Sequence, residues 1–443
     1  MYKRIGIIAV LFLSLLNISA QKKLNFVEVD STSYQLFQQQ KWRELIDYSA
    51  QSRKQGIDFF YLRARTGIAF FNLGKYRTAS EWFLKAYKSD QQFEWLQEYV
   101  YYSLVYSGRK AEAMKLANDF SPDMKSKIGF KRSKILRIAL EGGYSFNPDF
   151  DQLIALDLGK KANVNDDYGE AFFLEYYHFE SFDLSHQIVP GLSLNHNLTY
   201  LQSTLEQTVD WGTKTTFPAK TNQFQYFINP HFVLGQKIHL SPALSVLWGN
   251  TSYLAGWLDN NSNRNFTEVD NNFSDFIFST SVWSHFGNLS PGAEVNFANI
   301  YDETFTQLSA WVTFYPFSNT DFYITPRAYF KSDSENSFSY NTFGISGGAQ
   351  LGKVHLNGQY LVGDMENFVE AAGYVVSNIP GKSDHKFTGS IYVPIGRNGQ
   401  LIFRYINQNV EEKYRIYVAG VESNSINYNF TKHTITAGIS WNF

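Results

Sequence analysis

The chain ends with TKHTITAGISWNF (431–443), in which apolar and polar side chains alternate. Counting back by twos from Phe443, one face carries Trp441, Ile439, Ala437 and Ile435. The opposite face carries small and polar residues, namely Thr434, Thr436, Gly438, Ser440 and Asn442. A period of two residues is that of a β-strand, and this strand has one face suited to lipid and one suited to water. The segment therefore predicts a strand that lies between an apolar and a polar environment.

The same alternation recurs across residues 134–443. In IHLSPALSVLW (238–248), for example, Trp248 falls on the apolar face and Ser245 on the polar one. Polar stretches such as DNNSNRN (259–265) separate the alternating segments and are typical of turns and loops. This pattern predicts about 14 strands, within a range of about 12–16.

The connections between these strands fall into two classes. Short ones, such as FDLSH (182–186) and GRNG (396–399), alternate with long ones. The long connections are expected at 147–168, 203–221, 254–272, 364–383 and 412–429. Transmembrane β-barrels have short turns at one rim and longer loops at the other, and an even strand number returns both ends of the barrel to the same side. The pattern therefore predicts an antiparallel transmembrane β-barrel.

The composition agrees with a barrel and excludes several other classes of protein. The chain has 443 residues, 39 Lys and Arg against 41 Asp and Glu, and a net charge of −2, which gives no basis for binding nucleic acid. It has no cysteine, which excludes disulfide scaffolds, thiolate metal sites, cysteine nucleophiles and an acylated lipoprotein anchor. Its aromatic content of 17% fits rings on lipid-facing stripes and at membrane boundaries.

Residues 1–20 have the pattern of a secretory signal peptide. Lys3 and Arg4 precede the apolar run IGIIAVLFLSLL (5–16), and Ala20 ends the segment with a small side chain. The run is shorter than the roughly 20 residues of a membrane-spanning helix. An exported chain that spans a membrane without such a helix does so as a β-barrel, so the outer membrane of a Gram-negative cell is the expected location.

Residues 21–130 show a helical pattern with an internal repeat. Gly74 recurs 34 residues later as Gly108, and Ala79 recurs as Ala113. Small residues at fixed offsets allow two helices to approach each other closely. The residues expected to pack the repeats are Gly67, Gly74, Tyr76, Ala79, Ala86, Gly108 and Ala113. A period of 34 with this spacing resembles the tetratricopeptide repeat, a helix–turn–helix unit, and the resemblance implies a surface that binds a protein or an extended polymer.

The predicted fold is a two-domain α + β chain. It has a signal peptide at 1–20, periplasmic tetratricopeptide-like helical repeats at 21–130 and an antiparallel barrel at 134–443. The last strand resembles the signal that the barrel-assembly machinery reads on outer-membrane proteins. The residues that carry this resemblance are Ile439, Trp441 and Phe443. The expected partners are membrane lipid, the barrel-assembly machinery, and a periplasmic protein or polymer at the repeats, with no nucleic acid.

We expect no catalytic residues, no cofactor and no metal site. GISGG (344–348) matches G-x-S-x-G, but it lies in an alternating strand, whereas hydrolases place that serine at a strand-to-helix turn. The nine histidines are scattered and suggest no Ser/His/Asp set. The candidate functional residues are those expected to face the lumen, namely Glu294, Asn296, Tyr323, Arg327, Tyr329, His355 and Arg404. Their mixture of neutral polar, charged and aromatic groups suits water or a neutral polar solute.

The order of signal peptide, short repeats and a barrel ending in Phe443 resembles the YaiO-type outer-membrane proteins. It is also similar to the export porins for poly-N-acetylglucosamine and cellulose, and to the Slam-type translocators of surface lipoproteins. These resemblances imply a non-enzymatic, porin-like barrel that supports export or surface display of a polysaccharide or another polymer. The first alternative is a translocation or assembly factor for surface proteins. The second is a barrel-embedded hydrolase or acyltransferase.

Overall fold

The computed structural model describes residues 24–131, 133–156, 168–260, 264–301, 303–333, 340–378, 380–418 and 421–443. The predicted signal peptide lies outside these ranges. Within them, the chain divides into two compact units between Ser103 and Leu104. None of the helices in these ranges has the length and apolar character that crossing a membrane requires.

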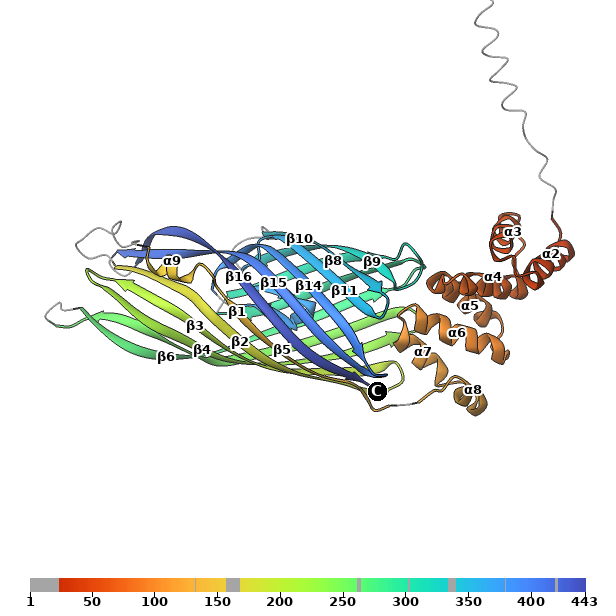
Figure 1. Cartoon of the computed structure of the whole chain (residues 1–443), viewed down its shortest axis with the longest axis horizontal. Helices are drawn as coiled ribbons and strands as arrows, with labels where there is room; N and C mark the ends of the chain where they lie inside the picture. Colours follow the sequence, from red (N-terminus) through yellow and green to blue (C-terminus); the bar gives the residue numbers. More distant parts are fainter. Residues whose placement is uncertain are drawn as a thin grey trace, which may run out of the picture. The chain divides into compact units, whose positions relative to one another are not determined.

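The N-terminal helices recur in pairs (Figure 1). The first helix of each pair begins at Phe26, Phe60 or Glu94, so these starts are 34 residues apart. The repeat seen in the sequence is therefore a repeat of helix pairs. The helices are α2 (Phe26–Gln38), α3 (Trp42–Lys54), α4 (Phe60–Asn72), α5 (Tyr76–Ser89), α6 (Glu94–Tyr106) and α7 (Lys110–Ala117), followed by α8 (Pro122–Lys127).

Small residues set how closely α4 and α5 approach each other. A Cβ atom added to Gly67 on α4 would lie 2.6 Å from Cε1 of Phe83 on α5, so only glycine leaves room for that ring. Ala79 and Ala86, also on α5, are fully buried. The close packing of this pair therefore depends on residues without bulk at the contact.

The other repeat residues occupy the turns and the second helices. Gly74 and Gly108 each precede the second helix of a pair with φ of +70° and +79°, a backbone conformation that glycine adopts without steric cost. Tyr76 packs against Phe71, with ring centroids 5.2 Å apart. Ala113 on α7 is fully buried.

Fourteen antiparallel strands close a barrel in the described part of the second unit. They are β1 (Ile135–Phe146), β2 (Tyr168–Val189), β3 (Leu192–Asp210), β4 (Lys214–Leu234), β5 (Ile238–Leu258), β6 (Arg264–Ser284), β7 (Leu289–Ile300), β8 (Glu303–Phe314), β9 (Phe322–Asp333), β10 (Tyr340–Leu351), β11 (Val354–Gly363), β14 (Lys382–Ile395), β15 (Gly399–Val418) and β16 (Val421–Asn442). Neighbours in sequence pair around the ring, and β1 pairs with β16 to close it, with Leu140 opposite Ile439. The predicted fold class and strand count are confirmed.

The two ends of the barrel differ. We call the end that carries the connections 190–191, 235–237, 285–288, 315–321, 352–353 and 396–398 the turn end, and the opposite end the loop end. Both the start of β1 and the end of β16 lie at the turn end, as an even strand number requires.

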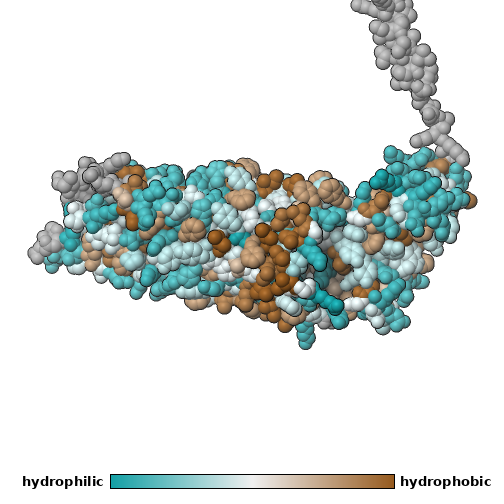
Figure 2. Space-filling model, in the orientation of Figure 1, coloured by the Kyte–Doolittle hydropathy of each residue, from teal (hydrophilic) through white to brown (hydrophobic). Residues whose placement is uncertain are grey.

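The outer wall of the barrel carries an apolar band. On β16, Ile435, Ile439 and Trp441 are exposed, whereas the intervening Thr436 and Ser440 are buried on the inner face. Figure 2 shows apolar side chains gathered in a band across the strands on the face in view. The alternation predicted from the last 13 residues is therefore the pattern of an apolar exterior and a polar interior, as in outer-membrane barrels.

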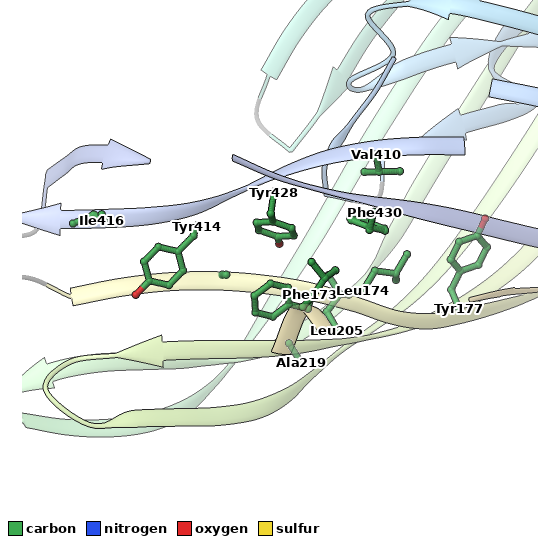
Figure 3. Packing of buried hydrophobic residues seen from close by; sticks show 12 residues of the cluster. Phe173, Leu174, Tyr177, Leu205, Ala219, Val410, Tyr414, Ile416, Tyr428 and Phe430 are labelled. Carbon is green, nitrogen blue, oxygen red and sulfur yellow. The ribbon is translucent and has the colours of Figure 1, made fainter. Parts of the chain in front are cut away.

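An apolar core fills the space near the loop end, beyond the end of the short strand β1. Phe173 and Leu174 from β2 pack there with Tyr414 from β15 and with Tyr428 and Phe430 from β16 (Figure 3). Residues 415–417 of β15 also pair directly with residues 168–170 of β2. Past the end of β1, the β15–β16 hairpin is therefore held to β2 by this pairing and by the apolar core.

Some of the predicted connections are wrong. β2 runs straight through 182–186, and the turn lies at Pro190 and Gly191 instead. Most of 203–221, 254–272 and 412–429 also belongs to strands. These segments carry many polar and charged residues, which suggested loops, but their backbone groups pair in regular ladders past the apolar band. Strands outside a membrane do not need an apolar face, so their alternation is weak.

Candidate functional site

A short hairpin occupies the inside of the barrel. It consists of residues 364–378, between β11 and β14, and contains β12 (Phe368–Glu370), the 3₁₀ turn η2 (Ala371–Gly373) and β13 (Val375–Ser377). We call residues 364–378 the inner hairpin. The sequence predicted an outside loop at 364–383, and this prediction is wrong because Phe368 and Val369 are buried against the inner wall. Their apolar side chains explain why this connection folds inward.

The inner hairpin reaches the opposite wall of the barrel. Val369 is fully buried in a cluster with Leu247 of β5 and Ile277 of β6. Ala372 packs with Phe227 of β4 and Ala243 of β5. Around the ring, β5 is six strands from β11 in one direction, and β4 is six strands from β14 in the other. The hairpin starts between β11 and β14, so it spans the lumen to the farthest wall.

Hydrogen bonds to the backbone of the hairpin hold it in place. Gln307 Nε2 on β8 donates to Val369 O at 2.6 Å, and Val369 N donates to Gln307 Oε1 at 3.2 Å. Gln225 Nε2 on β4 donates to Gly373 O at 2.9 Å. Polar groups in a buried place must be paired to avoid a cost, so these two glutamines specify where the hairpin lies.

Side chains of the hairpin make further polar contacts with the wall. Tyr374 OH donates to Asp183 Oδ1 on β2 at 3.1 Å, and Asn378 Nδ2 donates to Gln223 Oε1 on β4 at 2.6 Å. On the side of its own stem, Glu370 forms a buried ion pair with Lys386 of β14. All of these contacts are polar, and none is covalent, so a rearrangement can break and remake them.

The backbone of the inner hairpin is strained. Asn367, Ala371 and Ala372 have φ of +44°, +51° and +59°, which residues with a Cβ atom rarely adopt. Such conformations cost of order 1–3 kcal/mol each and persist where surrounding contacts impose them. The wall therefore holds the hairpin in a conformation that the segment would not prefer by itself.

A cavity of ≈ 590 Å³ lies between the inner hairpin and the turn end. The hairpin contributes Glu370, Ala372 and Val375 to its lining. The rings that line it are Trp283, Trp311, Tyr315 and Tyr329, and the polar residues include Asn229, Ser241, Thr313, Thr325 and Arg327. The guanidinium of Arg327 lies over the Trp311 ring, 4.1 Å from its centroid.

A second cavity of ≈ 370 Å³ lies between the hairpin and the loop end. Asn378 of the hairpin lines it together with Tyr301 and the charged side chains of Glu170, Glu412 and Arg415. The inner hairpin therefore lies between two cavities of the same lumen, each lined by both apolar and polar side chains.

The predicted lumen residues fall into three places. Glu294, Arg327 and Tyr329 line the cavity on the turn side, and Asn296 donates from Nδ2 to Glu294 Oε1 at 3.1 Å. Tyr323 and His355 stack on each other instead, with ring centroids 6.1 Å apart.

Arg404 lies apart from both groups and binds Glu141 of β1 through Nη1 at 2.5 Å. Ser346 of the G-x-S-x-G match lies inside β10, opposite Thr325 and Gln359 in the neighbouring strands, and not at a strand-to-helix turn. That geometry differs from the one a nucleophilic serine of this motif requires.

Sequence reasoning missed the inner hairpin as the central feature. The available signal was the apolar segment NFVEAAGYVVS (367–377) inside a connection that otherwise should be polar. An apolar run in a connection needs a buried surface to cover it, and the inner wall is the nearest one.

No family model matches this sequence, and neither does any curated protein. Among solved structures, the chain is similar to the Pseudomonas putida toluene transporter TodX, with 8% identity over 74% of this chain and 94% of that chain, and a TM-score of 0.45. It is similar to a Pseudomonas aeruginosa FadL homologue at 8% identity over the same shares, with a TM-score of 0.44. The translocator domain of the autotransporter NalP from Neisseria meningitidis matches at 10% identity over 77% of this chain and 99% of that chain, with a TM-score of 0.30. Likeness of this strength does not bear on what this chain binds or moves.

Proposed function

We propose that this protein is a gated outer-membrane passage for a polar polymer, with a polysaccharide as the first candidate, and that the inner hairpin is the gate. One observation carries the proposal: a strained segment spans the lumen and is held to the inner wall at β8 and β4 by polar contacts. A permanent plug needs no strained backbone. In a segment that must move, strain in the closed conformation lowers the free energy needed to release it from the wall.

The lining of the cavity on the turn side supports a carbohydrate cargo. Sugar rings present apolar faces and polar edges, so they suit a site that combines aromatic rings with hydroxyl and amide groups. Trp311 and Tyr315 supply rings there, while Thr313 and Thr325 supply hydroxyl groups and Asn229 an amide. The Thr325 hydroxyl donates to Thr313 Oγ1 at 2.9 Å, which keeps these two groups on one polar surface.

The helix pairs support a role in supplying the cargo. In this proposal they are tetratricopeptide-like repeats in the periplasm of a YaiO-like protein, and they collect the polymer or a partner protein. The repeating pairs offer a surface of regular spacing, which suits an extended ligand. The signal peptide at 1–20 exports the chain, and the barrel-assembly machinery inserts it.

The test is conductance across a planar lipid bilayer. Replacing residues 368–377 by a short Gly-Ser linker removes the gate, and we expect a steady conductance well above that of the wild type. A neutral oligosaccharide should then block the current more strongly than a neutral polyol of similar size, and Trp311→Ala should weaken that block. The matched control shortens the β3–β4 connection at 211–213, which lies at the loop end outside the hairpin.

Two results would contradict the proposal. A linker variant that is folded but conducts no more than the wild type would show that the lumen is closed by other means. If the oligosaccharide and the polyol block the current equally, the proposal of a polysaccharide cargo is contradicted, whereas the proposal of a gate is not.

A further inference from the structure

Three potential metal ligands meet where helix α7 contacts the turn end of the barrel. Glu112 comes from α7, His239 from the start of β5, and His285 from the residue after β6. His239 Nε2 lies 2.9 Å and His285 Nε2 3.5 Å from Glu112 Oε1. The three donor atoms all lie within 4.8 Å of one another. Their side chains are 2%, 4% and 13% exposed, so the cluster is screened from bulk water.

These separations are close to those around a bound cation. Zinc bonds to histidine nitrogen and carboxylate oxygen are about 2.0–2.2 Å long, which in tetrahedral geometry places neighbouring ligand atoms about 3.3–3.6 Å apart. The distance of 3.5 Å from Glu112 Oε1 to His285 Nε2 lies in this range, whereas the 2.9 Å to His239 Nε2 is shorter, so these two atoms must separate by a few tenths of an ångström when an ion binds. Two histidines with one carboxylate form a ligand set that zinc and related divalent transition metals accept.

The outer shell that orients such ligands is also present. His239 Nδ1 is 2.9 Å from His231 Nε2, and His285 Nδ1 is 2.7 Å from Ser290 Oγ. Each contact leaves the Nε2 atom of the ligand histidine directed at Glu112. Hydrogen bonds to the second ring nitrogen fix the tautomer and orientation of metal-binding histidines.

Arg109 completes the outer shell on the carboxylate. Its Nε donates to both oxygens of Glu112, at 2.8 Å to Oε2 and 3.0 Å to Oε1, and its Nη2 contacts Oε2. These hydrogen bonds from Arg109 fix the orientation of the Glu112 carboxylate beside His239 and His285.

We propose that Glu112, His239 and His285 bind one divalent cation of the zinc class, which fastens α7 to the turn end of the barrel. His285 also lines the cavity on the turn side, so water from that cavity takes the remaining coordination position. The site is independent of the proposed gate and of the cargo. It joins helix α7 to the start of β5 and to the residue that follows β6.

The competing account is a metal-free hydrogen-bond network with the same partners, and zinc binding distinguishes the two. The full chain is purified in detergent with an affinity tag that lacks histidine, stripped with EDTA, and dialysed against Zn²⁺. We expect one zinc per chain by elemental analysis. His285→Ala and Glu112→Gln should each weaken zinc binding by about 10–100-fold or more, since first ligands matter at least as much as their outer partners.

The matched control is His196→Ala. His196 stacks on His186, with ring centroids 5.2 Å apart, and both are half-buried, so this pair reports adventitious binding by histidines outside the proposed site. The control should keep its zinc. Heat-modifiable migration on a gel verifies that each variant barrel is folded, and Co²⁺ should give visible d–d absorption only where the site is intact.

A second readout tests the fastening role. Zn²⁺ should slow amide hydrogen exchange in residues 110–117 of the wild type and should leave the rate in Glu112→Gln unchanged. The proposal is overturned by folded wild type that takes up no zinc, by equal zinc in His285→Ala and the wild type, or by zinc that is lost only in His196→Ala. Zinc that binds without slowing exchange in α7 overturns the fastening role.

Discussion

Gln307 and Val369 exchange two hydrogen bonds across the lumen, one in each direction between the amide side chain and the peptide backbone. Gln307 is fully buried on β8, and Val369 is fully buried at the centre of the inner hairpin. The side-chain amide of Gln307 thus pairs with the backbone N–H and C=O groups of Val369, as the backbone of a neighbouring β-strand would. This pair is the most direct link between the wall and the proposed gate.

Gln307→Ala should loosen the gate. It leaves the N–H and C=O groups of Val369 buried without partners, which costs about 1–3 kcal/mol in the seated state. That cost corresponds to a rise of about 5–150-fold in the population of the unseated hairpin. The measurement is channel-opening frequency in a planar bilayer, with Thr306→Ala as control because Thr306 lies on the other face of β8. Equal opening frequencies in both variants would show that Gln307 does not hold the gate.

Lys386→Met should destabilise the protein more than the loss of a surface charge would. The substitution leaves the buried Glu370 carboxylate without Lys386, its partner in an ion pair. Removing one partner of a buried ion pair costs about 3–5 kcal/mol of stability. The double variant Lys386→Met, Glu370→Gln should recover most of the loss because no unpaired charge remains. The temperature at which the barrel loses its heat-modifiable migration reports the effect. A double variant as weak as the single one would contradict this account of the pair.

Gly67→Ala should destabilise the helical repeats. The added methyl group would lie 2.6 Å from the Phe83 ring, and overpacking of this kind costs about 1–3 kcal/mol. Hydrogen exchange in α4 and α5 should become faster in the full chain. Combining Gly67→Ala with Phe83→Leu should restore part of the protection because the smaller side chain makes room. Lys88→Ala, at an exposed position of α5, serves as the control. Unchanged exchange in Gly67→Ala would mean that the helices shift apart at little cost.

Phe443→Ser should reduce assembly in cells without much effect on the folded barrel. The Phe443 side chain is 49% exposed, while its backbone N–H donates to Leu136 O at 3.0 Å and needs no particular side chain. We therefore expect several-fold less barrel in the outer membrane but an unfolding temperature close to that of the wild type after refolding in detergent. Normal amounts in the membrane would show that the terminal ring is not part of an assembly signal.

The barrel could be predicted because its signal is local. In the last strand, every second residue from Ile435 to Trp441 faces outward, and the polar residues between them face inward. The helix pairs were equally visible, since Gly74 and Gly108 repeat at the 34-residue spacing of the helices. Both features depend only on periodicity along the chain.

The functional arrangement could not be predicted because it depends on contacts distant in sequence. Gln307 and Val369 are 62 residues apart, and Glu112 and His239 are 127 apart. No spacing rule connects such pairs, and the barrel must close before they meet. The long strands at the loop end were missed for a different reason, because strands outside a membrane lose the apolar face that marks them.

The most direct test of the gate is a disulfide bond that holds the inner hairpin against the barrel wall. A Cβ atom at Gly373 would lie 3.5 Å from Ser245 Cβ, a separation that a disulfide accepts. The natural chain has no cysteine, so Ser245→Cys with Gly373→Cys introduces the only two thiols. Gly373 has φ of +86°, so its substitution costs about 1–2 kcal/mol, and the single variant Gly373→Cys controls for that strain.

The decisive measurement is bilayer conductance of this double variant before and after reduction, with the disulfide verified by mass spectrometry. We predict that the oxidised protein shows no openings, that reduction produces openings at least as frequent as in the wild type, and that reoxidation abolishes them. An oxidised, cross-linked protein that conducts as well as its reduced form would contradict the account, because the passage would then not run through the place of the inner hairpin.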